Sequence, residues 1–205
     1  MRIEELKPSK RVPGRWLAVL EDTSILRIGE GEVVDFALYA GKELTPEQAQ
    51  ALTTAARRSG LKEKTLELLT RKPMSRRELE RKLADWEAGE EEAAAICNRM
   101  EELGFLNDGA YAVQVVRHYS QKGYGEHKLR DELYRRGVPR ELWEQALAQS
   151  VDPADAIDAF VCKKLAGKTP DRKELKKVSD ALARRGYSWE DISAALRRFG
   201  AQTEE

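Results

Sequence analysis

Residues 103–138 read LGFLNDGAYAVQVVRHYSQKGYGEHKLRDELYRRGV, and this stretch decides the fold of the chain. Gly104 can end one helix in a left-handed conformation, and Asn107 or Asp108 can cap the helix that follows. Apolar residues then recur at steps of three and four, the spacing of an amphipathic helix. These residues are Tyr111, Ala112, Val115, Val116 and Tyr119.

Two further helices are predicted from the same region. One follows Gly125, turns Leu129 and Leu133 inward and ends at Gly137, because glycine is favoured just after a helix. Pro139 then opens a third helix, since proline is tolerated at the first helical position. The stretch and the residues after it therefore predict a unit of three short helices.

The unit recurs along the chain. Leu133 and Gly137 have counterparts at Leu182 and Gly186, each 49 positions later, and Leu79 stands 50 positions before Leu129. A helical period of roughly 50 residues is typical of tandem arrays in which each unit buries its apolar stripe against a neighbour. The sequence thus predicts a mainly α protein with three tandem three-helix repeats in an elongated, curved array.

The first 41 or so residues have a different pattern. Trp16, Ala18 and Leu20 alternate with Leu17 and Val19, and apolar residues continue in Ile25–Ile28 and Val33–Leu38, which predicts short strands in a small antiparallel sheet. The turn Gly29–Gly31 lies between two of them and lacks the Lys-Ser/Thr and following helix of a phosphate-binding loop. Thr45 should cap a helix that runs to about Ser59.

These patterns divide the chain into consecutive parts. We expect a small sheet plus helix over 1–60, three-helix repeats over 61–106, 107–150 and 151–200, and a frayed tail over 201–205. Several residues are assigned structural roles at helix ends or in the cores of these repeats: Gly104, Asp108, Tyr111, Leu133, Gly137, Leu182 and Gly186.

Four phrases of the sequence, taken in order, resemble the RecX family of bacterial recombination regulators. They are RKPMSRRELERKL (71–83), LGFLNDGAYA (103–112), KGYGEHKLRDELYRRGV (122–138) and ALARRGYSWEDI (181–192). The resemblance covers nearly the whole chain. It implies tandem three-helix repeats behind a short strand region, and binding to the RecA recombinase and its DNA filament with inhibition or modulation of RecA activity in DNA repair, recombination and the SOS response.

Composition limits the other possibilities. Thirty-six basic and thirty-six acidic residues cancel, so net charge does not draw the whole molecule to DNA. Cys97 and Cys162 are isolated, and no signal peptide or apolar run of roughly 20 residues is visible, so we expect reduced thiols in a soluble, cytoplasmic protein. We also expect a monomer.

Catalytic patterns are lacking in the sequence. His118 and His127 have no second His or Cys one helical turn later, and no Ser-His-Asp or Cys-His arrangement supports nucleophilic catalysis. We therefore expect no catalytic residues, no metal, no cofactor and no enzyme activity.

The charge is uneven, and this is the main functional clue. Residues 163–198 hold eleven basic residues against five acidic ones, and residues 71–82 hold six against two. Such residues can meet phosphates or acidic protein groups, or they can simply form a solvated helix face. The candidates for contact with a filament or DNA are Arg76, Arg77, Arg81, Lys122, Lys128, Arg130, Arg135, Arg136, Arg172, Lys173, Lys176, Lys177, Arg184 and Arg185.

Two alternatives to a RecA-binding regulator stay open on the residues alone. The three-helix units could act like helix-turn-helix modules in a sequence-independent protein that binds single- or double-stranded DNA. They could equally form a helical scaffold for another protein. Near-zero net charge weighs against the first alternative, and nothing in the residues excludes the second.

Overall fold

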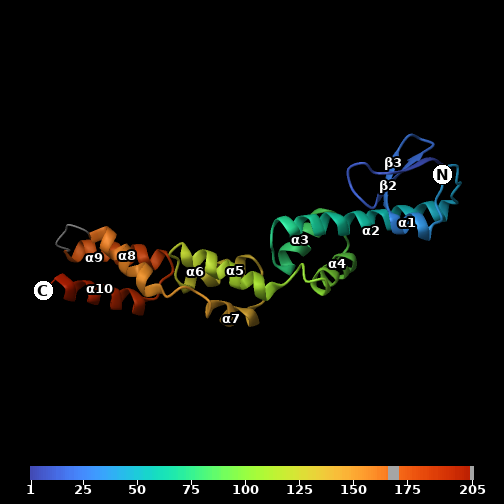
Figure 1. The fold of residues 1–205 in the computed structure, drawn as a ribbon. Helices are drawn as coiled ribbons and strands as arrows, with labels where there is room; N and C mark the ends of the chain where they lie inside the picture. Colours follow the sequence, from blue (N-terminus) through green and yellow to red (C-terminus); the bar gives the residue numbers. More distant parts are fainter. Residues whose placement is uncertain (166–170, 204–205) are drawn as a thin grey trace. The chain divides into compact units, whose positions relative to one another are not determined.

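The computed structural model describes residues 1–165 and 171–203 (Figure 1). Its contacts divide the chain into two compact units. The first unit comprises residues 1–72 and 83–96, and the second comprises residues 73–82 and everything from residue 97 onward. Among the described residues, no helix is both long and apolar enough to cross a membrane.

An antiparallel sheet opens the first unit. Its strands, in spatial order, are β1 (Ile3–Pro8), β2 (Arg15–Leu20) and β3 (Ile25–Gly29). One face of the sheet packs on helix α2, where Ile3, Ala18 and Ile28 join Leu52 and Ala56 in one apolar core. Because successive side chains of a strand point to opposite faces, these apolar residues share the buried face of the sheet.

The expected strand over Val33–Leu38 is wrong, because helix α1 (Glu30–Asp35) covers the first half of that segment. The Gly29 amide donates to the Glu32 carboxylate at 2.8 Å, which satisfies a free N–H at the start of the helix. Val34 is 72% exposed, so this apolar run is not a buried strand. The first strand of the sheet, β1, was not anticipated.

Helix α2 (Pro46–Arg71) is longer than the sequence suggested. Thr45 and Gln48 form the expected capping box, but the helix continues through Gly60, so the end predicted near Ser59 is wrong. Its buried stripe continues on both sides of Gly60, through Ala56 and Leu61. Burial along one face outweighs the local cost of a glycine in the helix.

The remaining helices follow the predicted three-helix pattern, and the described residues between 61 and 200 contain no strand. They are α3 (Arg76–Asp85), α4 (Glu90–Glu102), α5 (Asp108–Gln121), α6 (Glu126–Arg135), the 3-10 helix η1 (Arg140–Leu142) with α7 (Trp143–Leu147), α8 (Pro153–Leu165), α9 (Arg172–Arg184) and α10 (Trp189–Thr203). Because α10 runs to Thr203, the fraying expected from residue 201 is wrong up to that point; residues 204 and 205 lie outside the described part.

Each of the last two helical groups has its own core. In α5–α7, Tyr111 and Leu133 are buried with Val116 and Leu129. In α8–α10, Leu182 is fully buried, and Tyr187 is only 5% exposed. The protein is therefore mainly α with a small antiparallel sheet, as predicted, while the elongation and curvature of the array stay predictions.

Candidate functional site

The second Arg-Arg-Gly segment, at the end of α9, lies against the start of α6 within the second unit. The carbonyl oxygen of Arg185 accepts a hydrogen bond from the Gly125 amide, and that of Gly186 accepts one from the His127 amide, both at 3.0 Å. Free carbonyls at the end of one helix thus satisfy free amides at the start of another. We call this contact the α6–α9 junction.

Glycine is required on both sides of the α6–α9 junction. A Cβ atom on Gly125 would lie 2.5 Å from the Gly186 carbonyl carbon and from the Tyr187 nitrogen. Gly186 has φ of +86°, and a Cβ there would lie 2.5 Å from the Lys128 nitrogen. The backbones meet so closely that neither position has room for a side chain.

The first Arg-Arg-Gly segment, at the end of α6, makes an equivalent contact with α3. The Ser75 hydroxyl donates to the Arg136 carbonyl oxygen, and Gly137, with φ of +69°, packs on the aliphatic part of Arg77. Ser75 stands 50 positions before Gly125, so the two contacts occupy corresponding places in the repeat. The repeated motif is thus explained by packing between repeats.

Arg136 is the centre of a polar network under this contact. Its guanidinium donates to the Tyr111 hydroxyl at 2.6 Å and to the Tyr119 hydroxyl at 3.3 Å, and it lies 3.6 Å from the Glu78 carboxylate. The Arg136 Nε atom is buried and has no hydrogen-bond partner among the described residues. Burial and the Glu78 carboxylate raise the pKa of Tyr111 to about 12. This arginine therefore joins α3, α5 and α6.

The Glu132 carboxylate lies beside the guanidinium groups of Arg135 and Arg136. The residue is only 5% exposed, and burial alone would raise its pKa. The hydrogen bond from Arg135 at 2.5 Å and the charge of Arg136 outweigh burial, so the pKa of Glu132 is lowered. Both arginines of the predicted contact set at this position therefore form ion pairs with Glu132, although the Arg135 side chain is 67% exposed.

Arg76 and Asp108 form a second network, between α3 and the helices beside it. The Arg76 amide donates to the Asp108 carboxylate at 2.7 Å, and its guanidinium binds Glu80 at 3.0 Å and Glu101 at 2.8 Å. Burial raises the pKa of Asp108. Asn107, not Asp108, caps α5, since its side chain accepts from the Ala110 amide.

Three more of the predicted contact residues have partners inside the second unit. Arg130 pairs with Glu126 at 2.8 Å and with Glu144 at 3.0 Å, and Lys128 lies 3.9 Å from Glu132. Arg185 lies over the Phe160 ring, 4.7 Å from its centroid. These cations chiefly connect parts of the fold.

The other predicted contact residues are exposed and form no ion pair within the described part of the chain. They are Arg77, Arg81, Lys122, Arg172, Lys173, Lys176, Lys177 and Arg184. Lys122 lies 5.6 Å from the centroid of the Tyr119 ring. Five of these residues lie on α9, on surfaces away from the buried Val178 and Leu182. We call Arg172, Lys173, Lys176, Lys177 and Arg184 the basic face of α9.

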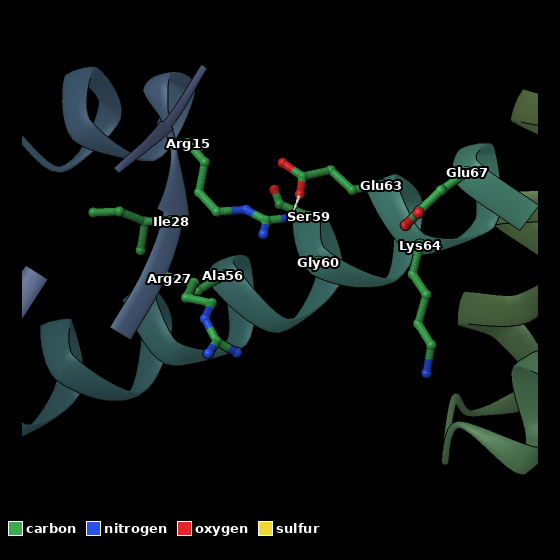
Figure 2. Close-up of a pocket in the computed structure, with 10 residues that line it drawn as sticks. Arg15, Arg27, Ile28, Ala56, Ser59, Gly60, Glu63, Lys64 and Glu67 are labelled. Atoms are coloured by element: carbon green, nitrogen blue, oxygen red, sulfur yellow. Dashed lines mark hydrogen bonds and ion pairs between the residues drawn. The ribbon is translucent and has the colours of Figure 1, made fainter. Parts of the chain in front are cut away.

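A pocket in the first unit lies between the sheet and α2. Figure 2 shows Arg15 reaching from β2 toward Glu63 on α2, with which it forms an ion pair. Ser59 donates to Glu32, and Lys64 lies 3.8 Å from the centroid of the Trp86 ring. Because these groups already contact one another, we assign the pocket to packing of the sheet on its helix.

No group of three or more His, Cys, Asp or Glu side chains suited to a metal ion occurs among the described residues. Cys97 is fully buried, and burial raises the pKa of its thiol to about 11, so it is a poor nucleophile at neutral pH. The functional feature of the second unit is therefore a surface for binding, the exposed basic face of α9, together with the internal contacts that hold its helices together.

The sequence predicts which cations are candidates for contact but does not reveal their partners inside the protein. Tyr119, Glu132 and Ser75 were not recognised as members of the networks around Arg136. The repeated Arg-Arg-Gly segment was the available signal, since a motif that recurs once per repeat is expected at a repeated contact.

Comparisons with known proteins agree on the family. RecX domain models match the chain at the first three-helix domain (62–100), the second (107–147) and the third (151–196). The regulatory protein RecX of Vibrio parahaemolyticus is 37% identical over 139 residues, covering 66% of this chain and 88% of that protein. RecX of Streptomyces coelicolor is 36% identical over 149 residues, covering 68% and 79%.

Solved structures show the same fold. A crystal structure of regulatory protein RecX matches 96% of this chain and 98% of its own, with a TM-score of 0.74 at 22% identity. That of RecX from Lactobacillus salivarius matches 72% and 99%, with a TM-score of 0.67 at 22% identity. Together with the sequence matches over all three repeats, these findings show that the chain belongs to the RecX family of noncatalytic regulatory proteins.

Proposed function

We propose that this regulatory protein binds the RecA recombinase and its DNA filament and inhibits or modulates recombinase activity in DNA repair, recombination and the SOS response. The proposal places the protein in the cytoplasm, where it acts as a monomer. It rests on membership of the RecX family and on one surface of the molecule, the basic face of α9.

The basic face of α9 supports a role in binding because its charges have no ion-pair partners of their own among the described residues. Lys173, Lys176 and Lys177 lie within about one turn of one another, and all three are exposed. Ammonium groups in this arrangement can meet the phosphates of a DNA filament or the carboxylates of a protein. By contrast, Arg76, Arg130 and Arg136 are held in internal ion pairs.

The repeats supply a second argument. A filament presents the same surface many times along its length. A protein with three related helical groups can make several weak contacts with such a polymer, and the first contact raises the effective concentration of the others. The proposal includes the division into three domains, each of which would meet a successive position along the filament. Their residues are 61–106, 107–150 and 151–200.

The test is a triple variant, Lys173→Ala, Lys176→Ala and Lys177→Ala. Each exposed ion pair is worth roughly 0.2–1 kcal/mol, so the loss of three should weaken binding to RecA–DNA filaments about tenfold at low salt. The difference should shrink as salt screens the charges. A titration of filament binding at several salt concentrations measures both effects, and a melting curve checks the fold.

The matched control keeps the charge and replaces the same three lysines with arginine. This variant should bind filaments nearly as well as the parent, because the long-range attraction is unchanged. If the alanine variant melts normally and binds filaments as tightly as the parent at every salt concentration, the basic face is only solvated surface.

The same face also suits a sequence-independent DNA-binding protein, and one comparison separates the two functions. Such a protein would bind DNA tightly without RecA, with a steep dependence on salt. Binding should therefore be measured on RecA–DNA filaments, on RecA alone and on DNA alone. Equal affinity for bare DNA and for filaments would favour the DNA-binding alternative.

A further inference from the structure

The outer face of the N-terminal sheet has no cover within the described residues of the first unit. In the antiparallel register, Leu17 of β2 stands between Lys7 of β1 and Arg27 of β3. The neighbouring residues Ala18 and Ile28 are buried on the other face, against α2. Leu17 is partly exposed and Ile25, on the same face as Arg27, is 57% exposed. We call this surface the outer sheet face.

The outer sheet face borders a pocket of about 710 Å³ that contains a local excess of positive charge. Five cations line it, Lys7, Lys10, Arg11, Arg15 and Arg27, against the single carboxylate of Glu5. Since the whole chain has no net charge, this excess is a property of the site.

Two of these cations are already paired. Lys7 binds Glu5 at 2.7 Å, and Arg15 pairs with Glu63 of α2 (Figure 2). Lys10, Arg11 and Arg27 are exposed and form no ion pair within the described part of the chain. Three positive groups therefore remain available to an outside partner.

The chemistry of the floor favours a peptide over a nucleic acid. The floor of the pocket is aliphatic and is formed by Val12, Leu17 and Ile25. None of the described residues that line the pocket has an aromatic ring. Proteins that bind single strands without sequence preference stack bases on aromatic side chains, which this surface lacks. An apolar centre inside a charged rim is instead the arrangement of a protein interface.

We propose that the outer sheet face binds an extended, acidic segment of a partner protein. Carboxylates of the segment would pair with Lys10, Arg11 and Arg27, and arginine can bind a carboxylate through two parallel hydrogen bonds. An aliphatic side chain between the carboxylates would lie on Leu17 and Ile25. The site lies outside residues 62–196, which hold the three family domains, so it is independent of the function proposed above.

The probe is a fluorescein-labelled peptide of alternating glutamate and valine, about eight residues or ~26 Å long when extended. Fluorescence anisotropy with the full-length protein should show saturable binding that weakens with salt. The variant Lys10→Ala, Arg11→Ala, Arg27→Ala should raise the dissociation constant about tenfold at low salt. Ile25→Ser should raise it severalfold, because it removes apolar contact but no charge.

The matched control is the α9 variant Lys173→Ala, Lys176→Ala, Lys177→Ala, which removes the same charge elsewhere. It should bind the peptide as the parent does, and a peptide with lysine in place of glutamate should not bind. Equal weakening by both triple variants would mean attraction to charge in general and would overturn the proposal.

Two further outcomes would also overturn it. One is unchanged peptide binding in the Lys10/Arg11/Arg27 variant when its melting curve matches the parent. The other is competition by an oligothymidylate of about eight nucleotides that displaces the peptide from the parent and binds the Lys10/Arg11/Arg27 variant more weakly. The site would then recognise phosphates. Loss of filament binding in the α9 variant leaves this proposal unaffected, so the two tests fail separately.

Discussion

Replacing Gly125 with alanine should loosen the α6–α9 junction and destabilise the end of the chain. The new Cβ atom would lie 2.5 Å from backbone atoms of Gly186 and Tyr187, which cannot rotate away as a side chain can. Such overpacking costs about 1–3 kcal/mol. Two hydrogen bonds of 3.0 Å across the junction, each worth roughly 0.5–1.5 kcal/mol, would stretch or break. The expected total is about 2–6 kcal/mol.

Thermal unfolding and hydrogen exchange would measure this loss. For a chain of this size 1 kcal/mol shifts the melting temperature by roughly 2–4 °C, so Gly125→Ala should lower it by about 4–24 °C. The amide of His127, which donates across the junction, should exchange faster than in the parent.

The control is Gly60→Ala in α2, where a new Cβ would have nothing within 4 Å. In the interior of a helix this exchange should stabilise the protein by about 0.5–1 kcal/mol. The two substitutions add the same methyl group, so opposite signs would isolate the effect of the junction. If Gly125→Ala melts with the parent and the His127 amide stays equally protected, the close approach of α6 and α9 does not contribute to stability.

Three other outcomes are expected. Leu182→Ala should cost roughly 2–5 kcal/mol in denaturant unfolding, because Leu182 is fully buried; a loss below about 1 kcal/mol would contradict its place in the core. At pH 8 a thiol reagent should rapidly modify exposed Cys162 and leave Cys97 intact, since burial raises the pKa of Cys97 to about 11. Mass spectrometry would locate the modification, and faster labelling of Cys97 than of Cys162 would contradict this prediction. Because folding raises the pKa of Tyr111 from 10.0 to about 12, its stabilising contribution is complete below pH 10 and falls as pH rises toward 12. Between pH 10 and 12 the free energy of unfolding should therefore fall more steeply in the parent than in Tyr111→Phe, which keeps only the smaller loss from Tyr187, whose pKa burial also raises. Equal slopes in the two proteins would refute this.

The helical repeats could be predicted because their signal is local and recurs. Leu133 and Leu182 occupy the same place in two units, and glycine follows each helix at Gly137 and Gly186. The strand predicted over Val33–Leu38 failed for the opposite reason. A short apolar run fits either a strand or a helix, and the Glu32 contact with the Gly29 amide decides in favour of the helix.

The candidate contact residues were only partly predictable, because the sequence does not reveal which cations have partners. Arg136 and Lys176 look alike in the sequence, each lying off an apolar stripe. Arg136 meets Tyr111, Tyr119 and Glu78, which are distant in sequence and brought together by packing of three helices. Sequence patterns place a residue on a helix face, but only tertiary structure determines what that face meets.

The helices α6 and α9 begin with different kinds of cap. Gly125 leaves the start of α6 without a side-chain cap, and carbonyls of the next repeat fill that role. The position corresponding to Gly125 in the third repeat is Glu174, yet α9 starts one turn earlier and is capped by Asp171, whose carboxylate accepts from the Glu174 amide at 2.7 Å. The amides at the start of α6 therefore depend on a tertiary contact, whereas the Glu174 amide at the start of α9 is satisfied by a residue of its own segment.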